Sequence, residues 1–365
     1  MTEAAPVGGD RLVAEVSVRG ERGAGGVGAG AVAVAEAYDA YVRCLADADE
    51  DGAVAIAGGL LHSGHDAEAV LLELVAPAQR QVGEWWQRNE WSVAQEHAAT
   101  HISERVVAAL GAAAPRPAAT RGRIVVTCLD GEWHALPARI VAEVLRLRGW
   151  TVTFLGASVP VPHLISYLHQ QDVDAVALSC ALATRLPAAH QAVQACRRAD
   201  VPIIVGGRGF GPDGRWARAI GASWAADATG AAALLDDPAT LHRPPAAAPH
   251  LADDEHTALV KRRADLVDEA AAELQRQFPP MRDYTPAQLD ATLADLTHIV
   301  DFLAAAVYVD DPELFTGFLA WTADVLQSRG VPAASLRIPL QRYRTLLYDF
   351  PRADQLLAAG LAQLA

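Results

Sequence analysis

The sequence predicts a multidomain protein of α and α/β architecture, because its hydrophobic pattern changes twice along the chain. Residues 31–114 have the apolar periodicity of helices, with the short connections of a four-helix bundle. Residues 121–240 alternate short β-branched runs with amphipathic runs, which predicts a parallel sheet with crossover helices. Residues 252–365 are helical again and indicate an all-α domain. Proline-containing linkers at 112–122 and 236–250 separate the three regions.

Composition and charge exclude several classes of function. The net charge of −14 argues against direct binding of nucleic acid or of an anionic membrane. The four cysteines form no CxxC pair, and two of them lie in apolar strand-like runs, as is typical of reduced thiols. No secretory leader and no apolar run of about 18 residues is evident, so we expect a cytoplasmic protein. Residues 1–30 are rich in glycine, alanine and charge, and we expect a disordered tail there.

The first helical region divides into four helices. Pro77 lies inside the third, where a proline is expected to kink the helix. Ser92 is followed three residues later by Gln95, a capping-box pattern that predicts the start of the fourth helix. The predicted helices are 31–48, 51–61, 66–88 and 92–110.

The middle region alternates strands and helices. Its predicted strands are 123–129, 151–155, 174–179, 202–206 and, more weakly, 222–226, and its predicted helices are 137–148, 161–171, 187–199 and 212–220. A phosphate-binding P-loop is absent, and so is a GxGxxG motif after the first strand. A nicotinamide cofactor is therefore not supported.

Residues with binding chemistry follow three of these strands. His134 lies in the loop after the first strand, Ser179 ends the third, and Gly206-Gly207 ends the fourth. Open α/β sheets bind ligands at the carboxyl ends of their strands. A neutral imidazole is the commonest protein metal ligand, and Glu132 is close enough to orient the ring, although Asp130 or a water would also serve. A structural hydrogen bond is the alternative role for His134.

This set resembles the motifs of cobalamin-binding Rossmann-like domains, which carry an acidic residue two positions before a histidine, then a serine, then two glycines. Here these are Glu132, His134, Ser179, Gly206 and Gly207. The resemblance implies that His134 coordinates cobalt from below. It further implies that the serine and the glycines line the slot for the displaced dimethylbenzimidazole tail.

The helical bundle carries a second resemblance. Trp86 is followed after nine residues by Glu96-His97. The light-sensing cobalamin proteins, including adenosylcobalamin-dependent repressors, carry this spacing. It implies that Trp86 packs over the adenosyl group of adenosylcobalamin, with Glu96 and His97 beside it. Each tryptophan taken alone is as well explained by an ordinary core position.

The sequence departs from these families at three positions. Pro137 replaces a glycine and Ala181 replaces a leucine of the cobalamin-binding motif. Gln87 stands where the light-sensing repressors have the histidine that takes the upper cobalt position after illumination. Other candidates for that position are His97 with His101, one helical turn apart, and His62 with His65.

The C-terminal region completes a domain order that resembles the photocobilins, in which a cobalamin photoreceptor module precedes a bilin-binding globin-like domain. The resemblance implies that aromatic residues line a cavity for biliverdin or a related bilin and that arginines meet its propionates. No cysteine follows Cys196, so a bilin would be held there without a thioether from this domain. The candidate bilin residues are His298, Tyr308, Trp321, Arg342 and Tyr343, with Phe315, Phe318, Tyr348, Phe350, Arg337 and Arg344 as further members.

The resemblances together predict a light sensor and not an enzyme. It would bind adenosylcobalamin and a bilin and signal to an unknown downstream protein, with a homodimer as one expected form. Two alternatives remain open: a corrinoid protein that serves a methyltransferase, and a cobalamin-binding regulator that does not respond to light.

Overall fold

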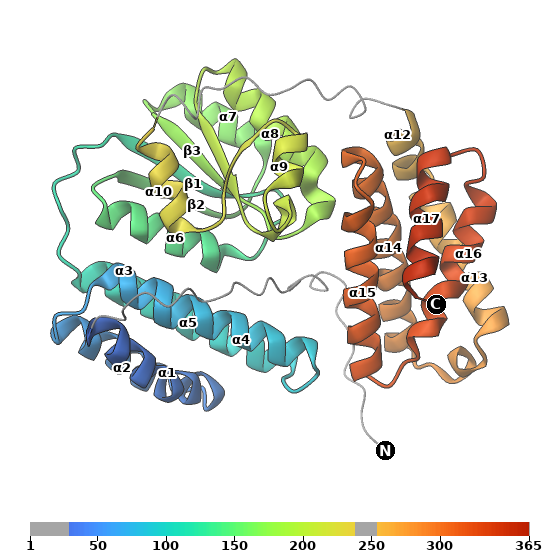
Figure 1. The fold of residues 1–365 in the computed structure, drawn as a ribbon, viewed down its shortest axis with the longest axis horizontal. Coiled ribbons are helices and arrows are strands. Elements are labelled where there is room, and N and C mark those ends of the chain that lie inside the picture. Colours follow the sequence, from blue (N-terminus) through green and yellow to red (C-terminus); the bar gives the residue numbers. More distant parts are fainter. Residues whose placement is uncertain (1–28, 238–253, 365) are drawn as a thin grey trace.

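The computed structural model describes residues 29–237 and 254–364, which form a helical bundle, an α/β domain and a C-terminal helical domain (Figure 1). The tail predicted at residues 1–30 lies almost wholly outside the described residues, as does most of the second linker. Within the described ranges, the three regions have the order that the hydrophobic pattern predicts.

The bundle is built from four helical rods, the third of which changes geometry along its length. Pro77 has no N–H to donate to the carbonyl of Glu73, and the rod widens to a π-helix just before it instead of ending. Ser92 and Gln95 form both hydrogen bonds of the predicted capping box. The elements are α1 (Ala29–Ala46), α2 (Glu50–His62), α3 (Ala67–Ala69), the π-helix η1 (Val70–Val75), α4 (Ala76–Gln87) and α5 (Val93–Ala113).

The α/β domain contains a parallel five-stranded sheet in the order β2-β1-β3-β4-β5. Alternate residues of β1 face two different cores, because successive side chains of a strand point to opposite faces. Helices α6 and α10 contact one another and the sheet, and α6 also packs against α5 of the bundle. The strands are β1 (Arg123–Leu129), β2 (Thr151–Val159), β3 (Ala175–Ser179), β4 (Ile203–Gly206) and β5 (Ser223–Ala225). The helices are α6 (Ala135–Leu147), α7 (Val161–Gln170), η2 (Ala183–Arg185), α8 (Leu186–Arg198), η3 (Arg208–Phe210), α9 (Arg215–Ala219) and α10 (Ala228–Leu235).

The C-terminal domain is helical throughout its described residues, and its long helix α14 lies at the centre of its core. The predicted helix 254–277 is two helices that meet at Arg262, and the predicted helix 332–349 is a 3-10 turn followed by a shorter helix. A globin-like arrangement stays a prediction. The elements are α12 (Asp254–Lys261), α13 (Arg263–Gln277), η5 (Pro279–Asp283), α14 (Pro286–Val309), α15 (Pro312–Ser328), η6 (Ala333–Leu336), α16 (Arg337–Leu346) and α17 (Pro351–Gln363).

Helix α14 is also the one helix of the described residues that is long and apolar enough to cross a membrane. Of its most apolar stretch, 61% is buried inside the fold, and it contacts α13, α15 and α17. Burial among neighbouring helices explains its hydropathy, as in the core of other helical domains.

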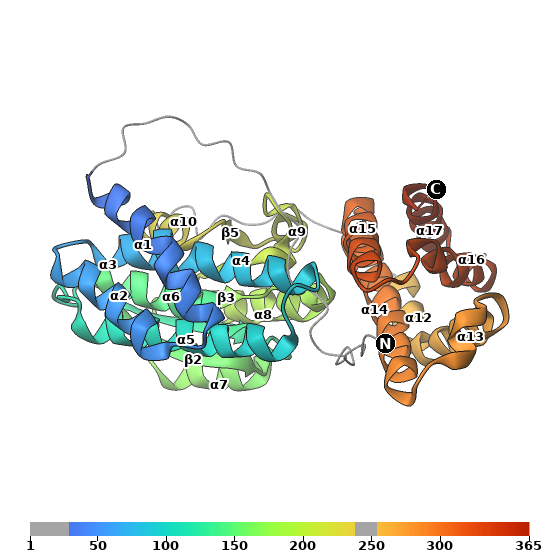
Figure 2. The same cartoon turned by 90° about the horizontal axis from the view of Figure 1, so that it is seen from below.

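The C-terminal domain contacts both other domains. Tyr308 of α14 hydrogen-bonds His190 of α8 at 2.7 Å, and Trp216 of α9 donates to Asp311 at 2.8 Å. At the end of α15, Ser328 donates to the backbone carbonyl of Gln87 at 3.2 Å. In Figures 1 and 2, the α14–α15 side of this domain faces both the α/β domain and the end of α4. These contacts bring segments that are 95 or more positions apart in the sequence against one another.

Replacing Ser92 by alanine should lower the free energy of unfolding by about 1 kcal/mol, because α5 loses its N-terminal cap. Urea denaturation followed by circular dichroism measures this change. Ser92→Asp, which keeps an oxygen acceptor at the cap, should retain most of the stability. An equal loss in both variants would show that the cap is not responsible.

Candidate functional site

The strand register places the three predicted features at one edge of the sheet. Cys128 of β1 pairs with Ser179 of β3, and Ser179 pairs with Gly206 of β4. The loop after β1 therefore begins beside Ser179 and Gly206. In this strand order, the crevice between β1 and β3 is the switch point where flavodoxin-like sheets bind ligands.

A buried carboxylate joins two loops at this edge. Glu132 is fully buried, and three N–H groups donate to its two oxygens. One oxygen accepts from the backbone N–H of His134 at 2.8 Å and from its Nδ1 at 2.5 Å, and the other accepts from the backbone N–H of Ala181 at 2.5 Å. Burial alone would raise the pKa of Glu132, but the hydrogen bonds and the charge of His134 lower it below its usual value. The side chain is therefore an anion that ties the loop after β1 to the loop after β3.

His134 is oriented for ligation by this carboxylate. His134 is the N-cap residue of α6, and its side chain is 33% exposed. With the proton on Nδ1 donated to Glu132, the lone pair on Nε2 is available to a metal. Among the described residues there is no group of three or more His, Cys, Asp or Glu side chains that could hold a metal. A single imidazole fits a metal that brings its other ligands with it, as cobalt in a corrin ring does.

Glycines at this edge allow close approaches between loops. Gly207 has a φ of +100°, and a Cβ atom there would lie 2.4 Å from the carbonyl oxygen of Cys180. Gly131 has a φ of +73°, and a Cβ atom there would lie 2.6 Å from the guanidinium carbon of Arg185. Any other residue would be strained at both positions, and at Gly207 it would also push the loops after β3 and β4 apart. The contact of Gly206, Gly207 and the half-buried Ser179 with a cobalamin tail stays a prediction.

The predicted upper-face residues flank the turn between α4 and α5. Trp86 lies in the last turn of α4 and is buried, and Glu96 and His97 lie in the first turns of α5. Glu96 accepts from His97 Nδ1 at 2.5 Å and from the Thr100 hydroxyl at 2.9 Å. The short turn thus brings all three predicted residues to one end of the bundle.

Trp86 also contacts the C-terminal domain. Its ring stacks on Trp321 of α15 with a centroid distance of 6.3 Å and an interplanar angle of 26°. The guanidinium of Arg329 lies 5.4 Å from the centroid of the Trp86 ring. Arg329 also interacts electrostatically with Asp295 of α14. The Oδ1 atom of Asp295 is buried and accepts no hydrogen bond within the described residues. The predicted adenosyl-packing residue is therefore part of a domain interface.

The five candidate bilin residues do not surround one cavity in the described structure. His298 lines a cavity next to the α/β domain, whereas Tyr308 bonds His190 and Trp321 stacks on Trp86. Arg342 pairs with Glu269 at 2.5 Å, and Tyr343 lies in the helical core with a buried hydroxyl that has no partner among the described residues. Of the further arginines, Arg337 donates to the carbonyl of Leu361 and Arg344 pairs with Asp354. Their role in bilin binding stays a prediction.

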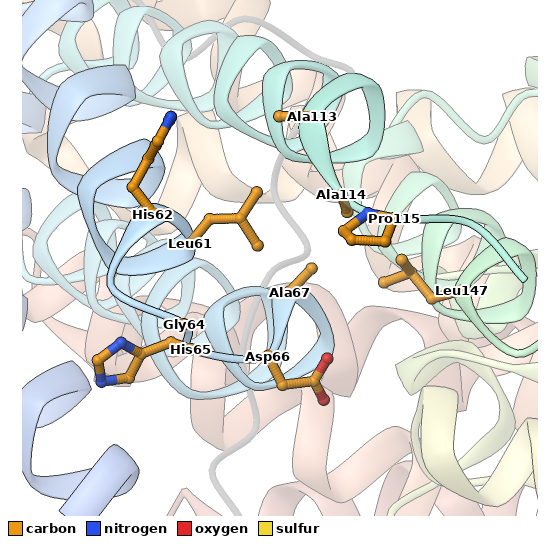
Figure 3. A pocket seen from close by; sticks show the side chains of 10 residues that line it. All are labelled: Leu61, His62, Gly64, His65, Asp66, Ala67, Ala113, Ala114, Pro115 and Leu147. Carbon is orange, nitrogen blue, oxygen red and sulfur yellow. The ribbon is translucent and has the colours of Figure 1, made fainter.

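His62 and His65 line a cavity of about 500 Å³ between α2, α3, the end of α5 and α6 (Figure 3). Each imidazole donates its Nδ1 proton to a backbone carbonyl, of Gly58 and Leu60 respectively. The helical rod from residue 67 to residue 87 separates this cavity from Trp86, a length of about 30 Å. These histidines are therefore at the wrong end of the bundle to contact a group that packs against Trp86.

Comparison with known proteins defines the class. A family model described as a B12 binding domain matches residues 122–235, and a second B12 binding domain model matches residues 37–110. The chain is therefore a cobalamin-binding protein, with a helical domain and a parallel-sheet Rossmann-like domain of the B12-binding type.

Its curated relatives are of two kinds. The HTH-type transcriptional repressor CarA of Myxococcus xanthus is 33% identical over 150 residues, which is 40% of this chain and 49% of the repressor. The chain thus spans about half of the length of that relative. Trimethylamine corrinoid protein 1 of Methanosarcina mazei is 26% identical over 199 residues, covering 52% of this chain and 88% of that protein. Among solved structures, the monomethylamine corrinoid protein of Methanosarcina barkeri has a TM-score of 0.49 and 18% identity, over 55% of this chain and 98% of that one.

Sequence reasoning did not find two contacts of this site. The backbone N–H of Ala181 binds Glu132, and Arg185 lies against Gly131. Both join residues about 50 positions apart in adjacent loops. The only signal for them is that β1 and β3 are neighbours, because a backbone N–H exists at every position except proline and gives no pattern.

Replacing Glu132 by glutamine should weaken cobalamin binding by roughly 10- to 100-fold, because an amide presents N–H groups where three donors need acceptors. Absorption titration with a cobalamin measures this affinity. Asp130→Asn, a neighbouring carboxylate whose side chain is exposed, is the matched control and should bind as the wild type does. Equal affinity of the two variants would contradict the role given to Glu132.

Asp295 should contribute a loss of stability as the pH rises from 5 to 8. Burial raises the pKa of this carboxyl to about 7, and Arg329 opposes the shift. A raised folded-state pKa gives stability that is present below the unfolded pKa and is lost as the pH rises through 7. Asp295→Asn should reduce this loss by roughly 2 kcal/mol. Thermal unfolding at pH 5, 6, 7 and 8 tests this, and identical pH profiles of the two proteins would contradict it.

Proposed function

We propose that this protein is a light sensor that binds adenosylcobalamin, with His134 as the lower cobalt ligand and Trp86 against the upper group, and that it is not an enzyme. The observation that carries the proposal is the position of Trp86. It belongs to the Trp86, Glu96 and His97 spacing that resembles the light-sensing cobalamin proteins, and it also contacts the C-terminal domain. A change at the upper group would therefore reach another domain directly.

Each residue of the site has a distinct task in this proposal. Glu132 keeps the proton on Nδ1 of His134 and so directs Nε2 at the metal. Glu96 holds its acceptor oxygens in place through His97 and Thr100 and can accept from ribose hydroxyls. Adenosylcobalamin would supply a cobalt–carbon bond that visible light breaks. Trp86 would lose its packing partner when the adenosyl group leaves.

The output we propose is a change in domain packing or in oligomeric state. The C-terminal domain contacts the bundle through Trp321 in the middle of α15 and through Ser328 and Arg329 at its C-terminal end. Rearrangement of Trp86 would loosen or tighten that contact. We propose that a separate signalling protein in the cytoplasm reads the change, without direct contact with nucleic acid or membrane, and that a homodimer is one form in which it is read.

We further propose that a bilin such as biliverdin binds without a covalent link and extends absorption to longer wavelengths. The support is the domain order that resembles the photocobilins, together with cationic and aromatic side chains in the C-terminal domain. This part of the proposal is independent of the cobalamin part, because each chromophore has its own absorption band.

A corrinoid carrier for a methyltransferase is the second candidate function. It is favoured by the relation to the trimethylamine corrinoid protein, 88% of which the chain covers. A carrier would pass the methyl group of methylcobalamin to an acceptor in the dark. The C-terminal helical domain and the spacing of Trp86, Glu96 and His97 favour the sensor instead. A regulator that binds cobalamin without responding to light would show neither behaviour.

The test is the absorption spectrum of the full chain loaded with adenosylcobalamin, recorded in the dark and after green light. We expect co-elution of the cofactor on gel filtration, and a spectral change on illumination. Trp86→Phe should alter the change in hydrodynamic radius that follows illumination. Trp85 stacks on Trp91 and not on the C-terminal domain, so the control variant Trp85→Phe should behave as the wild type. Bound cofactor with no spectral change under light would overturn the sensor, and dark methyl transfer from bound methylcobalamin would establish the carrier.

A further inference from the structure

A cavity of about 480 Å³ lies between the α/β domain and the C-terminal domain. On one side are Gly131, from the loop that holds Glu132 and His134, and Arg185 of η2. On the other side are residues of α12, α13 and α14, including His256, Arg263 and His298. The cavity is therefore shared by two domains and adjoins the loop of the cobalt ligand.

The charges that face this cavity do not balance. Among its lining residues, two guanidinium groups, of Arg185 and Arg263, face one carboxylate, of Asp301. The Arg263–Asp301 pair, at 3.3 Å, accounts for one of the two positive charges. In a chain of net charge −14, a cavity with an excess of positive charge is selective for anions.

Arg185 has donor capacity that the protein leaves unused. Its Nε–H is buried and has no hydrogen-bond acceptor within the described residues. A buried polar group without a partner costs free energy, and a ligand oxygen would recover it. Its guanidinium lies against Gly131, where the absence of a side chain lets it approach the backbone closely. The planar fork of a guanidinium suits the two oxygens of a carboxylate.

Most of the remaining wall is apolar, with Thr184 and Thr297 as its polar members. Ala304 and Ala305 of α14, with Leu182 and Val260, line the cavity beside the charged groups. Small side chains on a helix leave a flat surface against which an apolar chain or ring can pack. The ligand that this lining fits has an apolar body and a carboxylate at one end.

We propose that this cavity binds the carboxylate of an otherwise apolar molecule, held by Arg185 and Arg263 against the alanine face of α14. A linear tetrapyrrole with propionates and a long-chain fatty acid share this chemistry. For the tetrapyrrole the inference rests on the proposed function and gives the bilin its site, whereas for the fatty acid it stands by itself. Because two domains supply the cavity, a bound ligand stabilises their docking next to His134.

Two probes distinguish the sources, biliverdin and cis-parinaric acid, followed by absorption and by fluorescence on titration into the full chain. Arg185→Gln and Arg263→Gln should each weaken binding of the accepted probe by about 10-fold or more, since each removes a charged hydrogen-bond donor. Arg276→Gln is the control, because this arginine has an exposed side chain, pairs with Glu273 of α13 and does not line the cavity. Its affinity should equal that of the wild type.

Esterified probes separate carboxylate recognition from damage to the fold. Biliverdin dimethyl ester and methyl parinarate should bind the wild type more weakly than the acids and should bind the Arg185→Gln variant no more weakly than the wild type. Binding of the fatty acid alone supports the cavity but overturns the bilin part of the proposed function. The site is overturned if wild type, Arg185→Gln and Arg263→Gln bind the probe with the same affinity. It is also overturned if only Arg342→Gln loses binding, or if the wild type binds neither probe.

Discussion

The buried carboxylate of Glu132 is the interaction on which the rest of the site depends. A fully buried anion is tolerated only where its hydrogen bonds repay the loss of water, and here three N–H groups do so. The same bonds fix the tautomer of His134 and hold the loop after β3 at the end of β1. The orientation of the His134 ring and the spacing of the two loops are thus set by one side chain. Exchange of that residue would disturb both together.

Much of the fold was predictable because it rests on local pattern. The strands of the sheet are short runs rich in apolar residues, and four of the five were placed to within one residue, whereas β2 ends four residues later than predicted. The start of α5 followed from Ser92 and Gln95, which act within one turn. The pairing of Glu132 with His134 was accessible for the same reason, since two residues separate them. That Cys128, Ser179 and Gly206 lie side by side followed from the parallel strand order.

What the sequence did not reveal is which surfaces meet. Apolar periodicity predicts that Trp321 and Tyr343 are buried, but it does not say against what, and the structure places one on Trp86 and the other inside the helical core. The break at Arg262 has no proline or glycine to mark it. The cavity lined by Arg185 and His298 lies between domains, so no single stretch of sequence contains its pattern.

The contact of Ser328 with Gln87 joins positions 241 residues apart, and it has a consequence for the order in which the domains come together. Contacts of such separation form late, because the intervening chain must first be made and folded. Domains fold in order of synthesis, at about 5–20 residues per second, so the bundle and the sheet are complete before α15 has left the ribosome. During that interval, on the order of ten seconds, nothing from the C-terminal domain stands at the edge of the sheet. The edge of the sheet is therefore open on the nascent chain, and the last helices to be made close over it.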